Sequence, residues 1–176
     1  MKSGSGFGEM ARKEVPILGG KPVSQIGIVV KDIDRALEMY IGMWGLKGWK
    51  GYVYSSDNVR SLSYLGEPAD YRMKVAWRGV NPQVELVQSL DGPNIYEDWL
   101  ERRGEGLHHL GILVDSIETE VEVMQEAGYE VLMAGFGHGL DGDGGFAYID
   151  TEPELGVIIE LIEAPARRRP PDFLPG

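Results

Sequence analysis

Short runs of alternating apolar and polar residues recur along this 176-residue chain. The runs with the clearest strand character are VSQIGIVV (residues 23–30), QVELV (83–87), LHHLGILV (107–114) and GVIIELI (156–162). Residues two apart in a strand lie on the same face of a sheet. The pattern therefore predicts four strands, each with one face that can be followed residue by residue.

One polar residue of a metal-ligating type stands in the middle of each of these strands. On the predicted faces, Gln25 lies with Gly27 and Val29, and the other three strands place Glu85, His109 and Glu160 in the same way. A single polar residue in an apolar strand is commonly tolerated. Four of them, in paired positions, predict one metal site.

The chain also repeats itself. When Gln25 is aligned with His109, QIGIVVKDI lies over HLGILVDSI, and the closing strands QVELVQ and IIELIE align Glu85 with Glu160. Such self-similarity indicates two copies of one module, residues 22–90 and 106–164.

Each copy is predicted to pass from its first strand into an amphipathic helix. Asp32 and Ser116 have the side chains of helix N-caps, and glycines near residues 45 and 128 end the apolar helical pattern. Three more strands follow in each copy, at 52–56, 72–78 and 83–88 and at 130–134, 145–150 and 157–163. The module is therefore β-α-β-β-β.

The segments outside the modules have distinct characters. Residues 1–21 have no apolar core of a secretory signal and are expected to be a flexible lead-in. Residues 91–105 predict a linking helix with Asn94 as its N-cap. The Pro- and Arg-rich tail, 165–176, is expected to be an extended arm, with packing on a partner subunit as the alternative. Residues 55–70 predict a short strand or a flap over the site.

Composition removes several classes of function. The chain has no cysteine, which excludes disulfides, thiolate nucleophiles and Cys-based zinc sites and fits a cytoplasmic protein. Its net charge of −11 is opposite in sign to that of a nucleic-acid binder. No apolar run approaches the roughly 18 residues of a membrane-spanning helix. A small-molecule partner is expected.

Two features are candidates for binding that molecule. Arg72, Lys74 and Arg78 alternate with apolar residues on one predicted strand and form a basic patch for an anionic substrate, although a solvated strand face would give the same pattern. His138 lies in a glycine-rich stretch, residues 134–148, which predicts a loop able to close over substrate or simply a loop. His108 faces away from the predicted ligands and is interpreted as a structural histidine, with support of the metal site as the alternative.

Two stretches, WLERRGEGLHHLGILVDSI (99–117) and GVIIELIEAP (156–165), resemble the vicinal oxygen chelate superfamily. This superfamily includes glyoxalase I, methylmalonyl-CoA epimerase, extradiol dioxygenases and bleomycin-resistance proteins. The resemblance covers roughly residues 22–165 and looks closest to methylmalonyl-CoA epimerase. It implies an α+β fold in which two paired βαβββ modules form a cup-shaped mixed sheet around one divalent metal ion.

The resemblance also implies the ligands. The ligand positions of the family fall on Gln25, Glu85, His109 and Glu160 of this chain. The epimerases usually have His in place of Gln25 and Gln in place of Glu85, whereas the order Gln, Glu, His, Glu looks like that of some glyoxalase I enzymes. Such a set of mostly oxygen ligands suits a six-coordinate ion, Zn, Ni, Co, Mn or Mg, with two positions left for substrate.

The function expected on this basis is that of a metal-dependent isomerase or epimerase. It would abstract a proton α to the carbonyl of a carbonyl or thioester substrate through a stabilised enediolate, with Glu160 as the first choice of base and Glu85 as the second. The alternatives are a glyoxalase I-type lactoylglutathione lyase and a non-catalytic drug-binding protein. An extradiol dioxygenase, which usually has two His and one carboxylate around iron, is disfavoured by Gln25. The resemblance further implies a homodimer.

Overall fold

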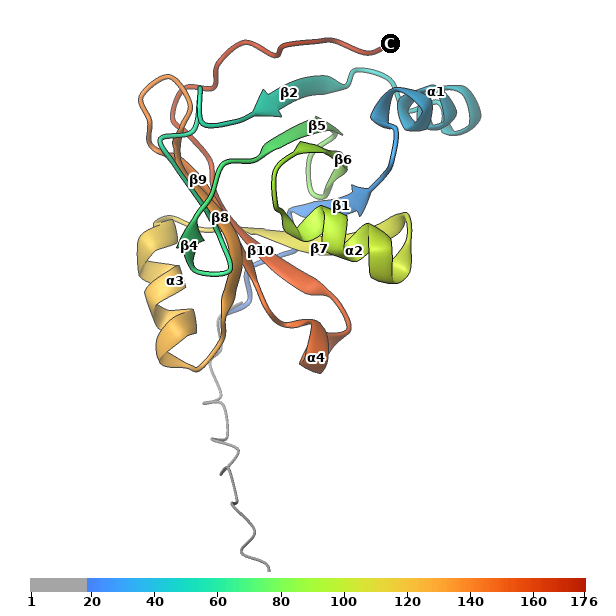
Figure 1. The fold of residues 1–176 in the computed structure, drawn as a ribbon. Helices are drawn as coiled ribbons and strands as arrows, with labels where there is room; N and C mark the ends of the chain where they lie inside the picture. Colours follow the sequence, from blue (N-terminus) through green and yellow to red (C-terminus); the bar gives the residue numbers. More distant parts are fainter. Residues whose placement is uncertain (1–18) are drawn as a thin grey trace, which may run out of the picture.

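The computed structural model describes residues 19–176, so the predicted lead-in lies almost entirely outside the described residues. Ten strands form one sheet in the order β2-β5-β6-β1-β7-β10-β9-β8-β3-β4. The sheet curls into a half-barrel (Figure 1). The strands are β1 (Gln25–Val29), β2 (Lys50–Tyr54), β3 (Ser61–Tyr64), β4 (Glu67–Pro68), β5 (Arg72–Arg78), β6 (Gln83–Asp91), β7 (Gly106–Leu113), β8 (Val131–His138), β9 (Gly144–Ile149) and β10 (Ile158–Glu163). The helices are α1 (Ile33–Trp44), α2 (Ile95–Arg103), α3 (Ile117–Glu126) and α4 (Glu152–Leu155).

The strand order confirms the predicted fold class. The first copy contributes β2-β5-β6-β1 and the second contributes β8-β9-β10-β7, which is the same arrangement. In each copy the first strand pairs in parallel with the last, and the two copies join where β1 pairs antiparallel with β7. The centre of the sheet is therefore formed by the four strands that carry the predicted ligands.

Three apolar clusters hold the sheet in its curled shape. Helix α1 covers the outer face of the first copy, where Ile33 and Leu37 pack on Ala76 and Leu86. Helix α3 covers the outer face of the second copy in the same way. Helix α2 instead supplies Tyr96 and its neighbours to the cluster on the inner face. Burial of these faces from water is what favours the closed arrangement.

The predicted helix N-caps are confirmed. The side chain of Asp32 accepts hydrogen bonds from the backbone N–H groups of the first turn of α1, and Asn94 and Ser116 do the same for α2 and α3. Helix α1 ends at Gly45, whose left-handed conformation (φ 70°) allows its N–H to bond back to the last turn. Sequence signals at helix ends were thus reliable in this chain.

Residues 55–70 contain the hairpin of β3 and β4, which agrees with the short strand predicted in this stretch. Its first strand, β3, pairs antiparallel with β8, so a hairpin of the first copy completes the sheet of the second copy. The backbone N–H of Leu65 also donates to the carbonyl of Leu132 at 2.8 Å. The two copies are therefore joined at two places, at β1–β7 and at β3–β8.

The loop predicted for the glycine-rich stretch 134–148 is wrong for most of its length. Strand β8 continues to His138 and β9 begins at Gly144, which leaves only a short turn between them. The glycines make room for rings: a Cβ on Gly144 would lie 2.5 Å from the His138 ring, and a Cβ on Gly135 would overlap the Phe146 ring. At Gly135 and Gly144, the absence of a side chain therefore allows a ring to pack against the strand.

The C-terminal tail is an extended arm that packs on its own chain. Phe173 forms an isolated antiparallel bridge with Gly51 of β2. The carboxylate of Asp172 accepts from the backbone N–H of Val53 at 2.7 Å, and Arg169 donates to the Val53 carbonyl at 2.6 Å. The tail therefore covers the free edge of the sheet at β2 (Figure 1).

None of the helices in residues 19–176 has the length and apolar character needed to cross a membrane.

Candidate metal centre

The four predicted ligands lie on the four central strands and share the inner face of the sheet. The strand register places them in two neighbouring cross-strand rows. These rows are Glu85–Gly27–His109 and Gln25–Gly111–Glu160. Each row has a ligand on both sides of one glycine, so the side chains converge over the space that the glycines leave open.

The two glycines make this convergence sterically possible. A Cβ on Gly27 would overlap the ring of His109. A Cβ on Gly111 would lie 2.8 Å from Cβ of Gln25, closer than real side chains approach. The repeated spacing in QIG and HLG therefore couples each ligand to a glycine on the facing strand, and both copies of the module use the same arrangement.

The donor atoms lie close together in the interior. Nε2 of His109 is 3.3 Å from Oε2 of Glu85 and 3.2 Å from Oε2 of Glu160. The ligand atoms of these three residues all lie within 4.8 Å of one another. His109 is fully buried, and Glu85 and Glu160 expose only 7% and 5% of their surface. Two buried carboxylates at one imidazole require a compensating positive charge.

The donor set fits a divalent ion. Among residues 19–176, the buried polar atoms without a hydrogen-bond partner include Oε1 of Gln25, Oε2 of Glu85, Nε2 of His109 and Oε2 of Glu160. Each predicted ligand thus contributes one such atom, although buried polar atoms are rarely left unpaired in native proteins. A metal ion bound by these four atoms would satisfy all of them, and one nitrogen with three oxygens is a suitable set for a divalent metal.

His108 contacts the metal-ligating ring from behind. Its Nδ1 lies 2.9 Å from Nδ1 of His109, and its own ring packs among Tyr96, Trp99 and Tyr148. His108 is fully buried. Burial lowers its pKa well below the ordinary value, and the neighbouring His109 lowers it further. A neutral His108 can accept the Nδ1–H of His109, which leaves Nε2 of His109 free to bind a metal.

The two carboxylates and the imidazole change one another's protonation. Burial alone would lower the pKa of His109, but Glu160 and Glu85 outweigh it and raise that pKa to about 9. Burial raises the pKa of Glu85, although the neighbouring His109 imidazole acts in the other direction. In the metal-free protein the imidazole therefore holds a proton at neutral pH, in the position that a metal ion would take.

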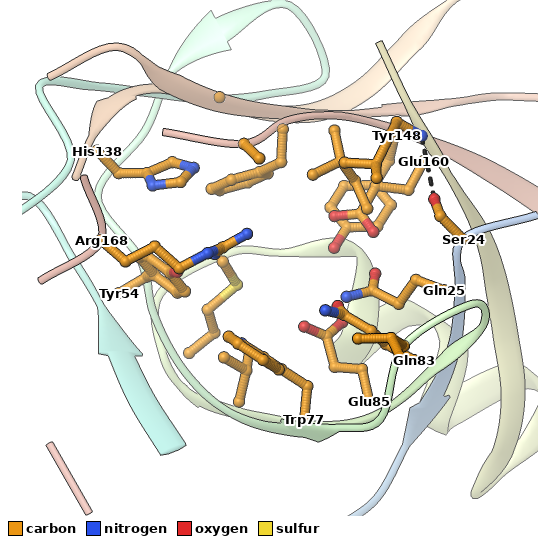
Figure 2. A pocket seen from close by; sticks show the side chains of 18 of the residues that line it. Ser24, Gln25, Tyr54, Trp77, Gln83, Glu85, His138, Tyr148, Glu160 and Arg168 are labelled. Carbon is orange, nitrogen blue, oxygen red and sulfur yellow. Dashed lines mark hydrogen bonds between the residues drawn. The ribbon is translucent and has the colours of Figure 1, made fainter. Parts of the chain in front are cut away.

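A cavity of about 230 Å³ opens directly over the carboxylates. Figure 2 shows Glu85 and Glu160 on two sides of one end, with Gln25 between them, and Arg168 and His138 at the other end. Trp77 and Tyr148 form part of the wall. The cavity therefore has an acidic end at the candidate metal centre and a basic end at the C-terminal tail.

Of the four residues predicted to bind substrate, only His138 lines this cavity. It is buried and packs edge-on against Tyr54. Burial, followed by the charge of Arg168, lowers the pKa of His138 to about 4, so its imidazole is neutral at pH 7.

The other three predicted residues, Arg72, Lys74 and Arg78, are absent from the cavity lining. Lys74 Nζ pairs with Asp34 of α1 at 2.7 Å, which places the side chain on the outer face of β5. Arg78 lies four residues from Lys74 on the same strand and shares that face, whereas a shift in register between Arg72 and Met73 interrupts the alternation at Arg72. Strand β5 instead presents Met73, Val75 and Trp77 to the cavity.

Two residues at the site are not among the predicted site residues: Arg168 belongs to the predicted tail, and Tyr148 belongs to a predicted strand. The signal for Tyr148 was available, because it is the cross-strand neighbour of Glu160 on β9 and therefore lies on the same face. Its hydroxyl accepts a hydrogen bond from Tyr96 at 2.7 Å.

Solved structures with the same fold include a hypothetical protein from Bacillus halodurans. Its TM-score is 0.59 at 22% identity, over 85% of this chain and 98% of that one. A methylmalonyl-CoA epimerase from Streptomyces coelicolor, in complex with 2-nitronate-propionyl-CoA, has a TM-score of 0.60 at 18% identity, over 83% and 99% of the two chains. A methylmalonyl-CoA epimerase from Mycobacterium tuberculosis has a TM-score of 0.54 at 22% identity, over 82% and 89%. At these identities the likeness shows the fold.

Sequence comparison gives the family. An uncharacterized protein of Bacillus subtilis (strain 168), YqjC, is 24% identical over 134 residues, which is 74% of this chain and 93% of that protein. The sequence pattern of the Glyoxalase/Bleomycin resistance protein/Dioxygenase superfamily matches residues 24–148, a range that contains Gln25, Glu85 and His109 and most of both modules. The chain therefore belongs to the glyoxalase/bleomycin resistance protein/dioxygenase superfamily.

Proposed function

We propose that this protein is a divalent-metal-dependent enzyme that removes a proton from the carbon α to a carbonyl, as an epimerase of the methylmalonyl-CoA type does. The observation that carries this proposal is the set of four buried, unpaired donor atoms at one end of a cavity. Two of the four residues, Glu85 and Glu160, are also able to accept a proton.

Gln25, Glu85, His109 and Glu160 would hold the ion. When bound, the ion would polarise the carbonyl of the substrate and so make the adjacent C–H group more acidic. The two carboxylates match its double positive charge, which makes the filled centre nearly neutral and lowers the cost of burying it.

The proton is transferred to a carboxylate of the chain. Glu160 and Glu85 come from different strands, β10 and β6, and border the cavity from two sides (Figure 2). Glu160 takes the proton as general base while the C–H electron pair moves toward the carbonyl. Glu85 takes up a proton from solvent, and delivery of that proton from the other side inverts the α carbon, whereas return of a proton from Glu160 restores it. Carboxylates on two sides of one cavity favour epimerisation in particular.

The size of the cavity bears on the substrate. Pockets that enclose whole drug-sized ligands hold roughly 300–1,000 Å³, and this cavity of about 230 Å³ is smaller. It therefore suits the reacting acyl end of a thioester, whose carrier group would lie outside. This favours an enzyme over a protein that sequesters a drug within the chain.

The test is exchange of the α hydrogen for deuterium in racemic methylmalonyl-CoA, followed by NMR in D₂O. The protein is stripped of metal and reloaded in turn with Zn, Ni, Co, Mn and Mg. We expect exchange that depends on at least one of these ions. Binding of fewer than about 0.2 ions per chain would contradict the metal site. A well-loaded protein that exchanges no α hydrogen would contradict the chemistry.

A glyoxalase I-type lyase is the second candidate, because the ligand order Gln, Glu, His, Glu resembles that of some glyoxalase I enzymes. It uses the same proton abstraction, so the site alone does not separate the two. Turnover of the methylglyoxal–glutathione hemithioacetal, without exchange of methylmalonyl-CoA, would select the lyase. The homodimer and the cytoplasmic location are predictions that accompany either reaction.

A further inference from the structure

Three consecutive arginines in the C-terminal tail have different partners. Arg167 pairs with Asp141, and Arg169 pairs with Asp172 at 2.7 Å. The chain around them is held on both sides, because the backbone N–H of Leu140 donates to the carbonyl of Arg167 at 2.9 Å and the guanidinium of Arg169 donates to the carbonyl of Val53 on β2. The tail therefore holds the residue between them, Arg168, in a defined position.

Arg168 points in the other direction, toward the cavity. Arg168 lines the cavity, whereas the side chains of Arg167 and Arg169 pair with aspartates outside it. Its guanidinium lies over the Trp77 ring, 5.1 Å from the centroid. Within residues 19–176, no acidic side chain lies within ion-pair distance of it. In a chain of net charge −11, an arginine that faces a cavity without such a partner is available to a ligand.

The charges around the cavity indicate what that ligand is. The charged residues of the lining are Glu85, Glu160 and Arg168, since His138 is neutral at pH 7. A divalent ion offsets the two carboxylates, and Arg168 then leaves one net positive charge. A single carboxylate on the substrate would neutralise it, and the planar fork of a guanidinium can bind a carboxylate through two hydrogen bonds. A phosphate, with nearly two negative charges, matches less well.

We propose that Arg168 is a specificity-determining residue that binds a carboxylate on the acyl part of the substrate, at the end of the cavity opposite the candidate metal centre. Among the thioesters that the proposed reaction can use, Arg168 would select short acyl groups with a free terminal carboxylate. Trp77 supports the guanidinium from one side. This inference rests on the proposed function for the reacting end of the substrate, but binding of the carboxylate can be measured without turnover.

The test compares the binding of thioesters that carry a free carboxylate with the binding of the same thioesters after that carboxylate is methylated. The pantetheine thioesters of malonic, succinic and glutaric acid, and their methyl esters, are titrated calorimetrically into the metal-loaded protein. We expect at least one acid to bind about 10-fold or more tightly than its ester. Arg168→Gln should abolish this preference without weakening binding of the esters, and Arg168→Lys should restore part of it. Arg35→Gln removes the same charge from the exposed face of α1 and should change nothing.

The outcomes separate the two proposals. Equal binding of acids and esters, a preference that survives in Arg168→Gln, or no measurable binding of any acid would overturn the carboxylate site. If the preference depends on Arg168 but no thioester exchanges its α hydrogen, the carboxylate site stands and the proposed reaction is wrong. If exchange occurs without a preference that depends on Arg168, the reaction stands and the carboxylate site is wrong.

Discussion

Gly27 and His109 face each other on the antiparallel strands β1 and β7, and the His109 ring occupies the space that a side chain at residue 27 would fill. The imidazole can occupy this position only because Gly27, on the neighbouring strand, has no side chain. Glu85 lies beside the same glycine on β6. One missing side chain therefore brings together ligands from two strands.

Replacement of Gly27 by alanine should displace His109 from the carboxylates. Overpacking of this kind costs about 1–3 kcal/mol of stability, and the shifted imidazole should reduce metal affinity. Gly42→Ala is the matched control. Gly42 lies within α1, and a Cβ added there would meet nothing within 4 Å beyond its chain neighbours and the helix backbone. That change should raise stability by about 0.5–1 kcal/mol. Thermal unfolding and metal titration measure both variants; wild-type metal affinity in Gly27→Ala would contradict the steric argument.

The two carboxylates should have unequal roles in proton transfer. Glu160→Gln keeps an oxygen ligand but removes the proposed base, so α-hydrogen exchange should fall about 10²- to 10⁴-fold. Glu85→Gln should slow inversion of the α carbon more than exchange, since Glu160 can still remove and return the proton. Exchange and racemisation of one methylmalonyl-CoA epimer are followed together, with metal content checked by elemental analysis. Near-wild-type exchange in metal-loaded Glu160→Gln would show that another group is the base.

Metal binding should release protons. The pKa of His109 in the metal-free protein is raised to about 9, above its ordinary value, so the imidazole is protonated at pH 7. A metal ion needs that nitrogen unprotonated, and its affinity should therefore weaken as pH falls below about 9. The stability of the metal-free protein should change in the opposite direction: the stability that the protonated imidazole contributes is complete below its ordinary pKa and is lost as pH rises toward 9.

Calorimetry in buffers of different ionisation enthalpy measures this release directly. At pH 7 we expect at least one proton per bound ion in wild type. His138→Gln changes a histidine outside the proposed ligand set and should release the same number. A release near zero would mean that His109 is already neutral without metal, in conflict with the influence of the two carboxylates on its pKa.

His108 should act through His109 and not on substrate. Its Nδ1 faces Nδ1 of His109 at 2.9 Å, and loss of such a support typically reduces metal affinity about 10- to 100-fold. His108→Phe removes the acceptor, whereas His108→Asn retains one near the same place and should keep more of the affinity. Metal dissociation constants, together with ¹⁵N NMR of the His109 tautomer, test this. Equal affinity in all three proteins would leave His108 with a packing role only.

The central strands could be predicted from the sequence because apolar and polar residues alternate along them. Alternation by two placed Gln25, Glu85, His109 and Glu160 on inward faces, and the repeat identified which positions correspond. The structure brings all four together at the inner face of the sheet, and their metal binding stays a prediction for the titrations described above.

The pairing of β3, the glycines near His138 and the position of Arg168 could not be predicted from the alternation of apolar and polar residues. The chain around β3 is mostly polar and short, and its partner β8 lies far away in the sequence, so nothing local indicated the pairing. The glycines around His138 have the composition of a loop, yet Gly135 and Gly144 leave room for aromatic or imidazole rings. Arg168 was not identified because a Pro- and Arg-rich tail has no apolar period to follow.

The hairpin that carries β3 has a consequence for how the molecule can be divided. A cut within α2 would separate the two repeats in sequence, but the C-terminal fragment would lack the strand that covers the edge of β8. Each fragment would expose unpaired backbone at more than one edge. The halves are therefore no longer exchangeable duplicates, and they should be recovered only as a reconstituted pair. The two repeats of this chain therefore form a single obligate folding unit.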